Sequence, residues 1–282
     1  MDDCNKLKCL ALEIRIATME QFLARGFGHI GGSLSICDVL AVLYGDVMRY
    51  RPDDPLWPGR DKLVVSKGHA GPAVYAALAL SGFFDRSMLK TLNQPGTSLP
   101  SHCDSRLTPG VDITTGSLGQ GTSLAAGLAF GDRLKGRDCK TYLIVGDGEL
   151  NEGQCWEAAM FSAHRRLDNL FWFVDWNKRQ LDSWTEEVSM PLDLAEKFRS
   201  FGFDVTLVNG HDVAQLKAAI ERASRVPGKP HCILMDTVKG YGVQEIEAVE
   251  YNHSLSPDAQ TCQRWISMLA DELKALQGGV SQ

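Results

Sequence analysis

Asp147 and Asn177 are the residues whose type and spacing best suit metal chemistry in this chain of 282 residues. Asp147 follows the apolar run 141–145, and Asn177 comes thirty residues later, just past a second apolar run at 170–174. Both side chains offer the hard oxygen atoms that Mg²⁺ prefers, and Mg²⁺ takes many of its other ligands from phosphates and water. The pair therefore indicates a site for a magnesium diphosphate.

A strand-helix-strand unit is the predicted structure that brings the pair together. Apolar side chains recur at helical spacing from Trp156 to Ala163, between the two runs. The strands of such a unit are parallel, so if they are neighbours their carboxyl ends lie ~4.8 Å apart. A helix beginning near Gly153 is expected to direct free N–H groups toward the same crevice. Gly146 and Gly148 allow a close approach of the backbone to phosphates.

The rest of the chain predicts an α/β fold. Its architecture is a mostly parallel sheet of about five strands with helices on both faces, in a single domain over residues 1–282. Ser35 and Asp38 resemble a capping box at the start of a second helix. No element is predicted for the proline-containing stretch 93–112. Further strands are predicted at 62–66, 204–208 and 232–235, and further helices at 5–25, 72–80, 212–225 and 257–276.

Composition excludes several classes of protein. The net charge of −6 and the dispersed Lys and Arg residues argue against a nucleic-acid groove. No uninterrupted apolar run reaches the ~20 residues of a membrane span, and the N-terminus lacks the pattern of a secretory signal. Eight scattered cysteines without a CxxC pair are typical of reduced thiols in a cytoplasmic protein.

Five motifs in a fixed order make the chain resemble transketolase, specifically the N-terminal chain of bacterial split transketolases. They are GHIGGSLS, SKGHA, TTGSLGQG, GDGELNEG with its later Asn, and KGYGV, and the resemblance runs from His29 to His253. It implies the thiamine diphosphate-binding fold, with thiamine diphosphate and Mg²⁺ as cofactors. The implied reaction transfers a two-carbon ketol unit from a ketose phosphate donor to an aldose or aldose phosphate acceptor.

The resemblance also assigns residues to roles. It places four histidines around the reacting groups, although the family usually has Gly-His-Pro where this chain has Ser101-His102-Cys103. The Mg²⁺ ligands would be Asp147, Asn177 and the backbone carbonyl of Arg179. The implied catalytic residues are His29, His69, His102 and His253, and the implied cofactor-binding residues are His69, Gly116, Ser117, Leu118, Gly146, Asp147, Gly148, Glu152 and Asn177.

A partner subunit is implied as well. In transketolases the glutamate that activates the cofactor belongs to a pyrimidine-binding domain, and no second α/β pattern follows His253 here. The expected partner is therefore a C-terminal transketolase subunit, with two such pairs forming a heterotetramer. Three alternatives remain: the alpha subunit of a 2-oxo acid dehydrogenase, an enzyme like deoxyxylulose phosphate synthase, and a binding module without chemistry. The separate histidine motifs and TTGSLGQG argue against the dehydrogenase.

Overall fold

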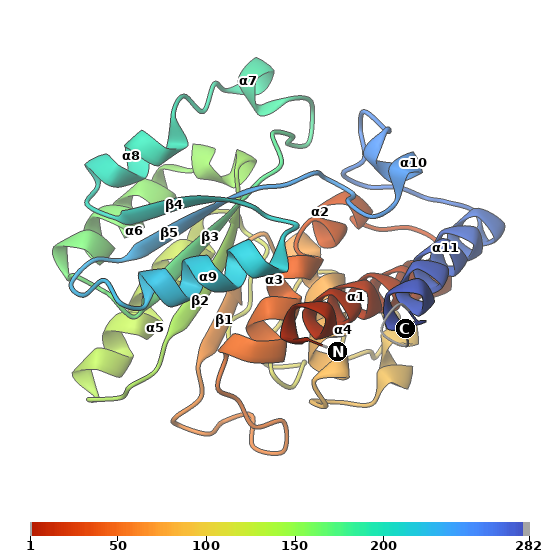
Figure 1. The fold of residues 1–282 in the computed structure, drawn as a ribbon, viewed down its shortest axis with the longest axis horizontal. Helices are drawn as coiled ribbons and strands as arrows, with labels where there is room; N and C mark the ends of the chain where they lie inside the picture. The colour runs from red at the N-terminus through yellow and green to blue at the C-terminus, as the bar shows by residue number, and fades with distance from the viewer. Residues whose placement is uncertain (1, 279–282) are drawn as a thin grey trace.

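A five-stranded parallel sheet forms the centre of the molecule (Figure 1), in a computed structural model that describes residues 2–278. The strand order is β1-β2-β3-β5-β4, and every neighbouring pair is parallel. This confirms the predicted fold class. The ends of the predicted single domain, residues 1 and 279–282, lie outside the described residues. The strands are β1 (Lys62–Val65), β2 (Thr141–Gly146), β3 (Leu170–Trp176), β4 (Asp204–Asn209) and β5 (His231–Asp236).

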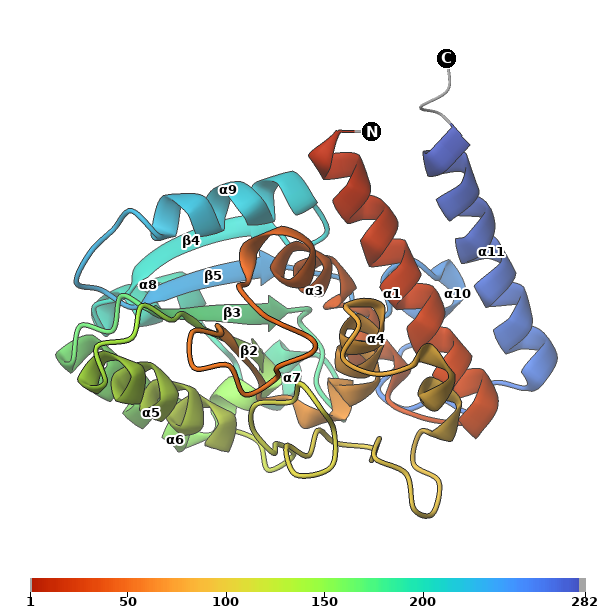
Figure 2. The ribbon, with the colours of Figure 1, turned by 90° about the horizontal axis from the view of Figure 1, so that it is seen from below.

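Helices cover both faces of the sheet, as Figure 2 shows with α9 on one side and α5 and α6 on the other. Side chains alternate between the two faces along each strand. Tyr142 and Ile144 of β2 pack in one apolar cluster, while Leu143 and Val145 pack in the other. The first cluster includes residues of α1 (Asp3–Arg25), α3 (Cys37–Val42), α4 (Gly71–Leu80), α9 (Val213–Ala223) and α11 (Ala259–Gly278). The second includes residues of α5 (Gln120–Leu134), α6 (Gly153–His164) and α8 (Leu194–Ser200).

Most predicted helices are present, with ends set by identifiable residues. Gly26 ends α1 in the left-handed conformation, with φ of 85°. The capping box predicted for Ser35 and Asp38 is wrong. The chain forms α2 (Ile30–Leu34) and then α3, whose N-cap residue Ile36 makes no side-chain capping bond. The Ser35 hydroxyl donates instead to Asp175. Two further short helices are α7 (Thr185–Val188) and α10 (Gln244–Glu247), and residues 93–112 form turns, as expected.

One segment, Ile30–Val47, is long and apolar enough by composition to cross a membrane, but 83% of it is buried inside the domain. It contains α2 and α3, and α3 packs against α1, α4 and α9. The apolar character of this segment is accounted for by its place in the core.

Candidate active site

A cavity of about 270 Å³ lies at the carboxyl edge of the sheet, where ligands bind in open α/β folds. Its walls come from the loops that follow β1, β2, β3 and β5, together with loops around His29, His102 and His253. Segments distant in sequence are thus brought to one place by the parallel strands. The predicted catalytic histidines and the predicted metal ligands all line this cavity.

The predicted metal ligands follow neighbouring strands, as the strand-helix-strand unit requires. Gly146 of β2 is paired with Asp175 of β3, so Asp147 and Asn177 each lie just past this pair. The Lys178 amide donates to Asp147 Oδ2 at 2.5 Å. Asn177 Nδ2 donates to Asp175 Oδ2 at 2.9 Å, which directs the amide oxygen of Asn177 away from that carboxylate. Asp147 is therefore held by the turn after β3, and Asn177 is held by β3 itself.

These residues fit a divalent cation bound through a diphosphate. Burial, and after it the negative charge of Asp175, raises the pKa of Asp147 to about 7. A cation beside Asp147 would offset this unfavourable environment for a carboxylate. Within residues 2–278 no cluster of three His, Cys, Asp or Glu residues could hold a metal by itself. A metal here would need oxygen atoms from a ligand, as Mg²⁺ sites with phosphates have.

Arg179 lines the cavity, and its guanidinium has partners in a neighbouring loop. Its guanidinium donates to the carbonyl oxygens of Val249 and Glu250, both at 2.8 Å, and lies over the ring of Trp184. The side chain is thus directed to the 249–250 loop. The expected role of the Arg179 backbone carbonyl as a metal ligand stays a prediction.

Four histidine rings gather in the cavity. The ring of His29 lies 5.5 Å from that of His69, 5.9 Å from His102 and 5.1 Å from His253, measured between centroids. The rings of His69 and His253 are 4.7 Å apart. Burial is the main cause that lowers the pKa of all four, to about 3 for His253 and well below its ordinary value for His69. The four imidazoles are therefore neutral at neutral pH.

Two buried lysines in the cavity were missed by the sequence analysis. The Lys67 ammonium donates to the Gly32 carbonyl at 2.7 Å and pairs with Asp175 at 2.5 Å. The Lys239 ammonium lies 3.3 Å from both the Gln180 carbonyl and Nδ1 of His253. Burial lowers the pKa of Lys239 to about 8. The position of the two lysines could have indicated them, because each belongs to a motif that follows a predicted strand. Lys67 lies in SKGHA and Lys239 in KGYGV.

Glu149 is the third residue that sequence reasoning missed. Its buried carboxylate accepts hydrogen bonds from the amides of Gly119 at 2.8 Å and Gly146 at 3.1 Å, and from the Ser66 hydroxyl. It thereby ties the TTGSLGQG loop to the turn after β2 and places Gly116 and Leu118 in the cavity wall. No pattern in the sequence distinguished it from the neighbouring acidic residues.

Two expected cofactor-binding residues and the start of α6 lie outside the lining of this cavity, and their expected roles stay predictions. Ser117 and Glu152 are exposed and are not among the residues that line the cavity. Glu152 caps α6 with extended backbone. The 3-10 turn Gly148–Asn151 stands between Asp147 and α6, so this turn, and not the start of α6, lines the cavity.

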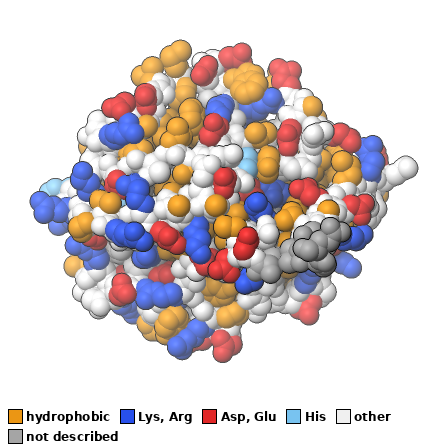
Figure 3. Space-filling model, in the orientation of Figure 1, with side chains coloured by type: hydrophobic (Ala, Val, Ile, Leu, Met, Phe, Trp, Pro, Cys, Tyr) orange, Lys and Arg blue, Asp and Glu red, His pale blue; other side chains and the backbone are white. Residues whose placement is uncertain are grey.

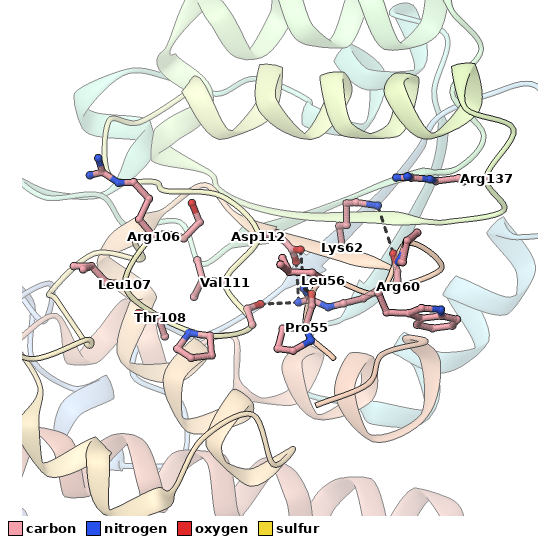
Figure 4. Close-up of a pocket in the computed structure, with 15 residues that line it drawn as sticks. Pro55, Leu56, Arg60, Lys62, Arg106, Leu107, Thr108, Val111, Asp112 and Arg137 are labelled. Atoms are coloured by element: carbon pink, nitrogen blue, oxygen red, sulfur yellow. Dashed lines mark hydrogen bonds and ion pairs between the residues drawn. The ribbon is translucent and has the colours of Figure 1, made fainter. Parts of the chain in front are cut away.

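A larger cavity, of about 500 Å³, lies beside the loop that leads into β1 (Figure 4). Arg60 in its floor makes an ion pair with Asp112 at 3.0 Å, and Lys62 pairs with Asp132 at 2.5 Å. The predicted site residues are absent from its lining. Because its buried charges are matched within the protein, the smaller cavity is the better candidate for chemistry.

Comparison with known proteins identifies the family. The model of the transketolase thiamine diphosphate binding domain matches residues 7–264. The chain belongs to the transketolase family. A 6-deoxy-6-sulfo-D-fructose transketolase subunit from a Clostridium species is 51% identical over 86% of this chain and 88% of its own length. An apulose-4-phosphate transketolase subunit from Phocaeicola vulgatus is 36% identical over 89% of each chain.

Solved transketolases share the fold. The enzyme from Campylobacter jejuni superposes with a TM-score of 0.85 at 27% identity, covering 100% of this chain and 49% of that one. A Pichia stipitis transketolase in complex with sedoheptulose 7-phosphate gives a TM-score of 0.84 at 27% identity, covering 98% of this chain and 45% of that one. The chain is an N-terminal transketolase subunit, a transferase subunit, and relatives named as subunits imply a partner. These relatives favour transketolase over the dehydrogenase and synthase alternatives.

Proposed function

We propose that this chain binds thiamine diphosphate and Mg²⁺ in the histidine-lined cavity. With a C-terminal transketolase subunit it transfers a two-carbon ketol unit between sugar phosphates. The observation that carries the proposal is the convergence of four histidines with Asp147 and Asn177 on one cavity of about 270 Å³. A transketolase needs both groups of residues at one place, because the metal site holds the cofactor where the histidines meet the substrate.

Each group of residues has a task in this proposal. Asp147, Asn177 and the Arg179 carbonyl would hold Mg²⁺, and Lys239 would offset diphosphate charge from the cavity wall. When bound, thiamine diphosphate supplies the carbon nucleophile and the electron sink. The neutral imidazoles of the four histidines are suited to taking up and returning protons at the hydroxyl and carbonyl groups of a sugar.

The proposed donor is a ketose with an anionic group at its far end. Sugar phosphates are the substrate class that the family resemblance implies. The Clostridium relative, at 51% identity, is named for a sugar that carries a sulfonate on carbon 6. Ketose phosphates and this sulfonated ketose both carry an anionic group at the end of the sugar chain. D-fructose 6-phosphate and 6-deoxy-6-sulfo-D-fructose are therefore the two donors to compare directly.

Exposed apolar side chains at the mouth of the cavity support the proposed partner. Leu118 and Leu181 line the cavity and are 39% and 62% exposed, and Trp184 beyond them is 42% exposed. A pyrimidine-binding domain placed over the mouth would cover this apolar surface and close the cofactor between the subunits. We propose that two such pairs form a heterotetramer.

The proposed location is the cytoplasm, where reduced cysteines and sugar phosphates are both found. None of the eight cysteines is joined in a disulfide within the described residues 2–278. No nucleic acid is proposed as a partner, since Lys and Arg alternate with Asp and Glu over the face in Figure 3 without forming a continuous basic band.

The decisive experiment measures ketol transfer by the purified full chain, with and without the C-terminal subunit from the same organism. Excess thiamine diphosphate and Mg²⁺ are present, and both donors are tested. We expect transfer only when both subunits are present. Turnover by this chain alone would contradict the partner, and turnover of pyruvate in place of ketoses would contradict the reaction.

A further inference from the structure

His211 contacts the loop that carries Lys239 from outside the cavity. It lies between β4 and α9, and its side chain is only 6% exposed. The Val238 amide donates to His211 Nε2 at 2.9 Å. The ring of Tyr241 stacks on the imidazole, with centroids 3.5 Å apart and an angle of 11° between the planes. The imidazole thus binds this loop on both sides of Lys239.

The hydrogen bond from Val238 fixes the tautomer of His211. Because Nε2 accepts a hydrogen bond from the Val238 amide, the ring proton must be on Nδ1. That nitrogen lies 2.8 Å from Asp38 Oδ2 and donates to it. Asp38 is buried and also paired with Arg15, whose Nε donates to the Tyr241 carbonyl at 3.2 Å. The network therefore starts and ends on the same loop.

Other contacts hold the loop on the side of the cavity. The Lys239 carbonyl accepts from Asn252 at 2.8 Å, and the Gly240 amide donates to the Gly31 carbonyl at 3.0 Å. The Val238 carbonyl accepts from the Tyr241 amide at 3.2 Å, and His211 is the partner that holds the Val238 amide itself. That amide lies one residue before Lys239, so a rotation of the chain at Val238 would move the Lys239 ammonium away from His253, which it approaches to 3.3 Å.

We propose that His211, oriented by Asp38, is a positioning residue that fixes Lys239 in the cofactor cavity. The inference rests on the proposed function to the extent that Lys239 faces a diphosphate there. The residue acts through the Val238 peptide and lies outside the cavity lining. It links the β4–α9 turn, which carries none of the expected site residues, to the site.

The first test measures Lys239 directly in the full chain without cofactor. Lys239 is 5% exposed and Lys67 is 2% exposed, so both should react slowly with acetic anhydride. His211→Asn keeps a donor for Asp38 but is too short to accept from Val238. We expect this variant to raise acetylation of Lys239 several-fold, measured by mass spectrometry, while Lys67 stays protected. His211→Gln, which can reach the Val238 amide, should retain most of the protection.

The second test titrates the same proteins with thiamine diphosphate and Mg²⁺ by calorimetry. Losing one hydrogen bond that positions a ligand group should weaken binding about five- to tenfold in His211→Asn. His231→Asn is the matched control, because His231 is also a buried histidine within 3.4 Å of an aspartate but lies at the opposite end of the sheet. This control should leave the affinity and Lys239 labelling unchanged.

Several results would overturn the inference. Equal rises in labelling of Lys239 and Lys67 would mean general loosening, and unchanged labelling of both would mean that His211 does not position the loop. If His211→Asn does not fold, Tyr241→Leu removes the ring that stacks on His211 and faces the Arg15 guanidinium, and it must still raise Lys239 labelling above that of Lys67. A wild-type chain that binds no thiamine diphosphate even with partner would instead contradict the proposed function, and the labelling result would stand apart from it.

Discussion

Lys67→Met removes a buried cation while nearly keeping the length of the side chain. The Lys67 side chain is 3% exposed, and its ammonium donates to the Gly32 carbonyl, the Ser35 hydroxyl and Asp175. Asp175 has no exposed surface. Burial disfavours the charge of Asp175, but the charge of Lys67 and the hydrogen bonds from Lys67, Thr237 and Ser35 together outweigh that effect and hold the pKa of this carboxyl below its ordinary value. The variant would therefore leave a buried carboxylate without its counter-ion.

The expected loss follows from what remains around Asp175. Breaking a buried ion pair by removing one partner typically costs ~3–5 kcal/mol. Asp175 keeps three neutral donors, from Ser35 at 2.7 Å, Asn177 at 2.9 Å and Thr237 at 2.5 Å. The lower end, ~3 kcal/mol in the free energy of unfolding, is therefore expected. For a domain of this size that corresponds to a fall of roughly 6 °C in Tm.

Urea denaturation and calorimetry at pH 7 check this value. The double variant Lys67→Met with Asp175→Asn removes both charges, so it should be more stable than Lys67→Met alone. Lys274→Met is the matched control, since Lys274 and its partner Asp271 are both 74% exposed, and no measurable loss is expected. A loss below ~1 kcal/mol in Lys67→Met, or a double variant as unstable as the sum of the singles, would refute the reasoning.

Three further predictions concern the proposed activity. Asp147→Ala should abolish metal-dependent binding of thiamine diphosphate in calorimetry while the circular dichroism spectrum keeps its folded form, because a ligand is lost and not core; unchanged affinity would contradict the metal site. His29→Ala and His69→Ala should each lower turnover of the complete enzyme ~10²–10⁴-fold with little change in Tm, and a lower Tm with retained turnover would make that histidine structural. Because Lys239 is protonated below its pKa of about 8, affinity for the diphosphate should fall as pH rises through that value, whereas Lys239→Arg should show no such fall.

The parallel sheet was predictable because its strands are short apolar runs with clear ends. All five predicted strands are present within two residues of their predicted ends. Asp147 and Asn177 could be predicted to lie together because they follow strands that are consecutive along the chain. The residues around Asp147 and Asn177 are enough to show that each side chain comes directly after a strand.

The hydrogen-bonded supports of the site could not be predicted in the same way. Glu149 binds Gly119 from thirty residues away, and Asp175 binds Ser35 across 140 residues. Such contacts depend on how loops fold onto one another after the sheet has formed. The capping box was wrong for this reason: a long-range partner, Asp175, takes the hydroxyl of Ser35.

The charges in the cavity explain why its own residues leave room for an ionic ligand. Lys67 is matched by Asp175, but Lys239 has no carboxylate within ion-pair distance among the described residues. Asp147 accepts hydrogen bonds from two backbone amides. Within residues 2–278 no lysine or arginine forms an ion pair with it. Lys239 and Asp147 attract each other without forming an ion pair, and a buried charge without a paired partner is costly. A metal beside Asp147 and an anion beside Lys239 would offset both costs at once, and a magnesium diphosphate is a single ligand that brings the two charges together.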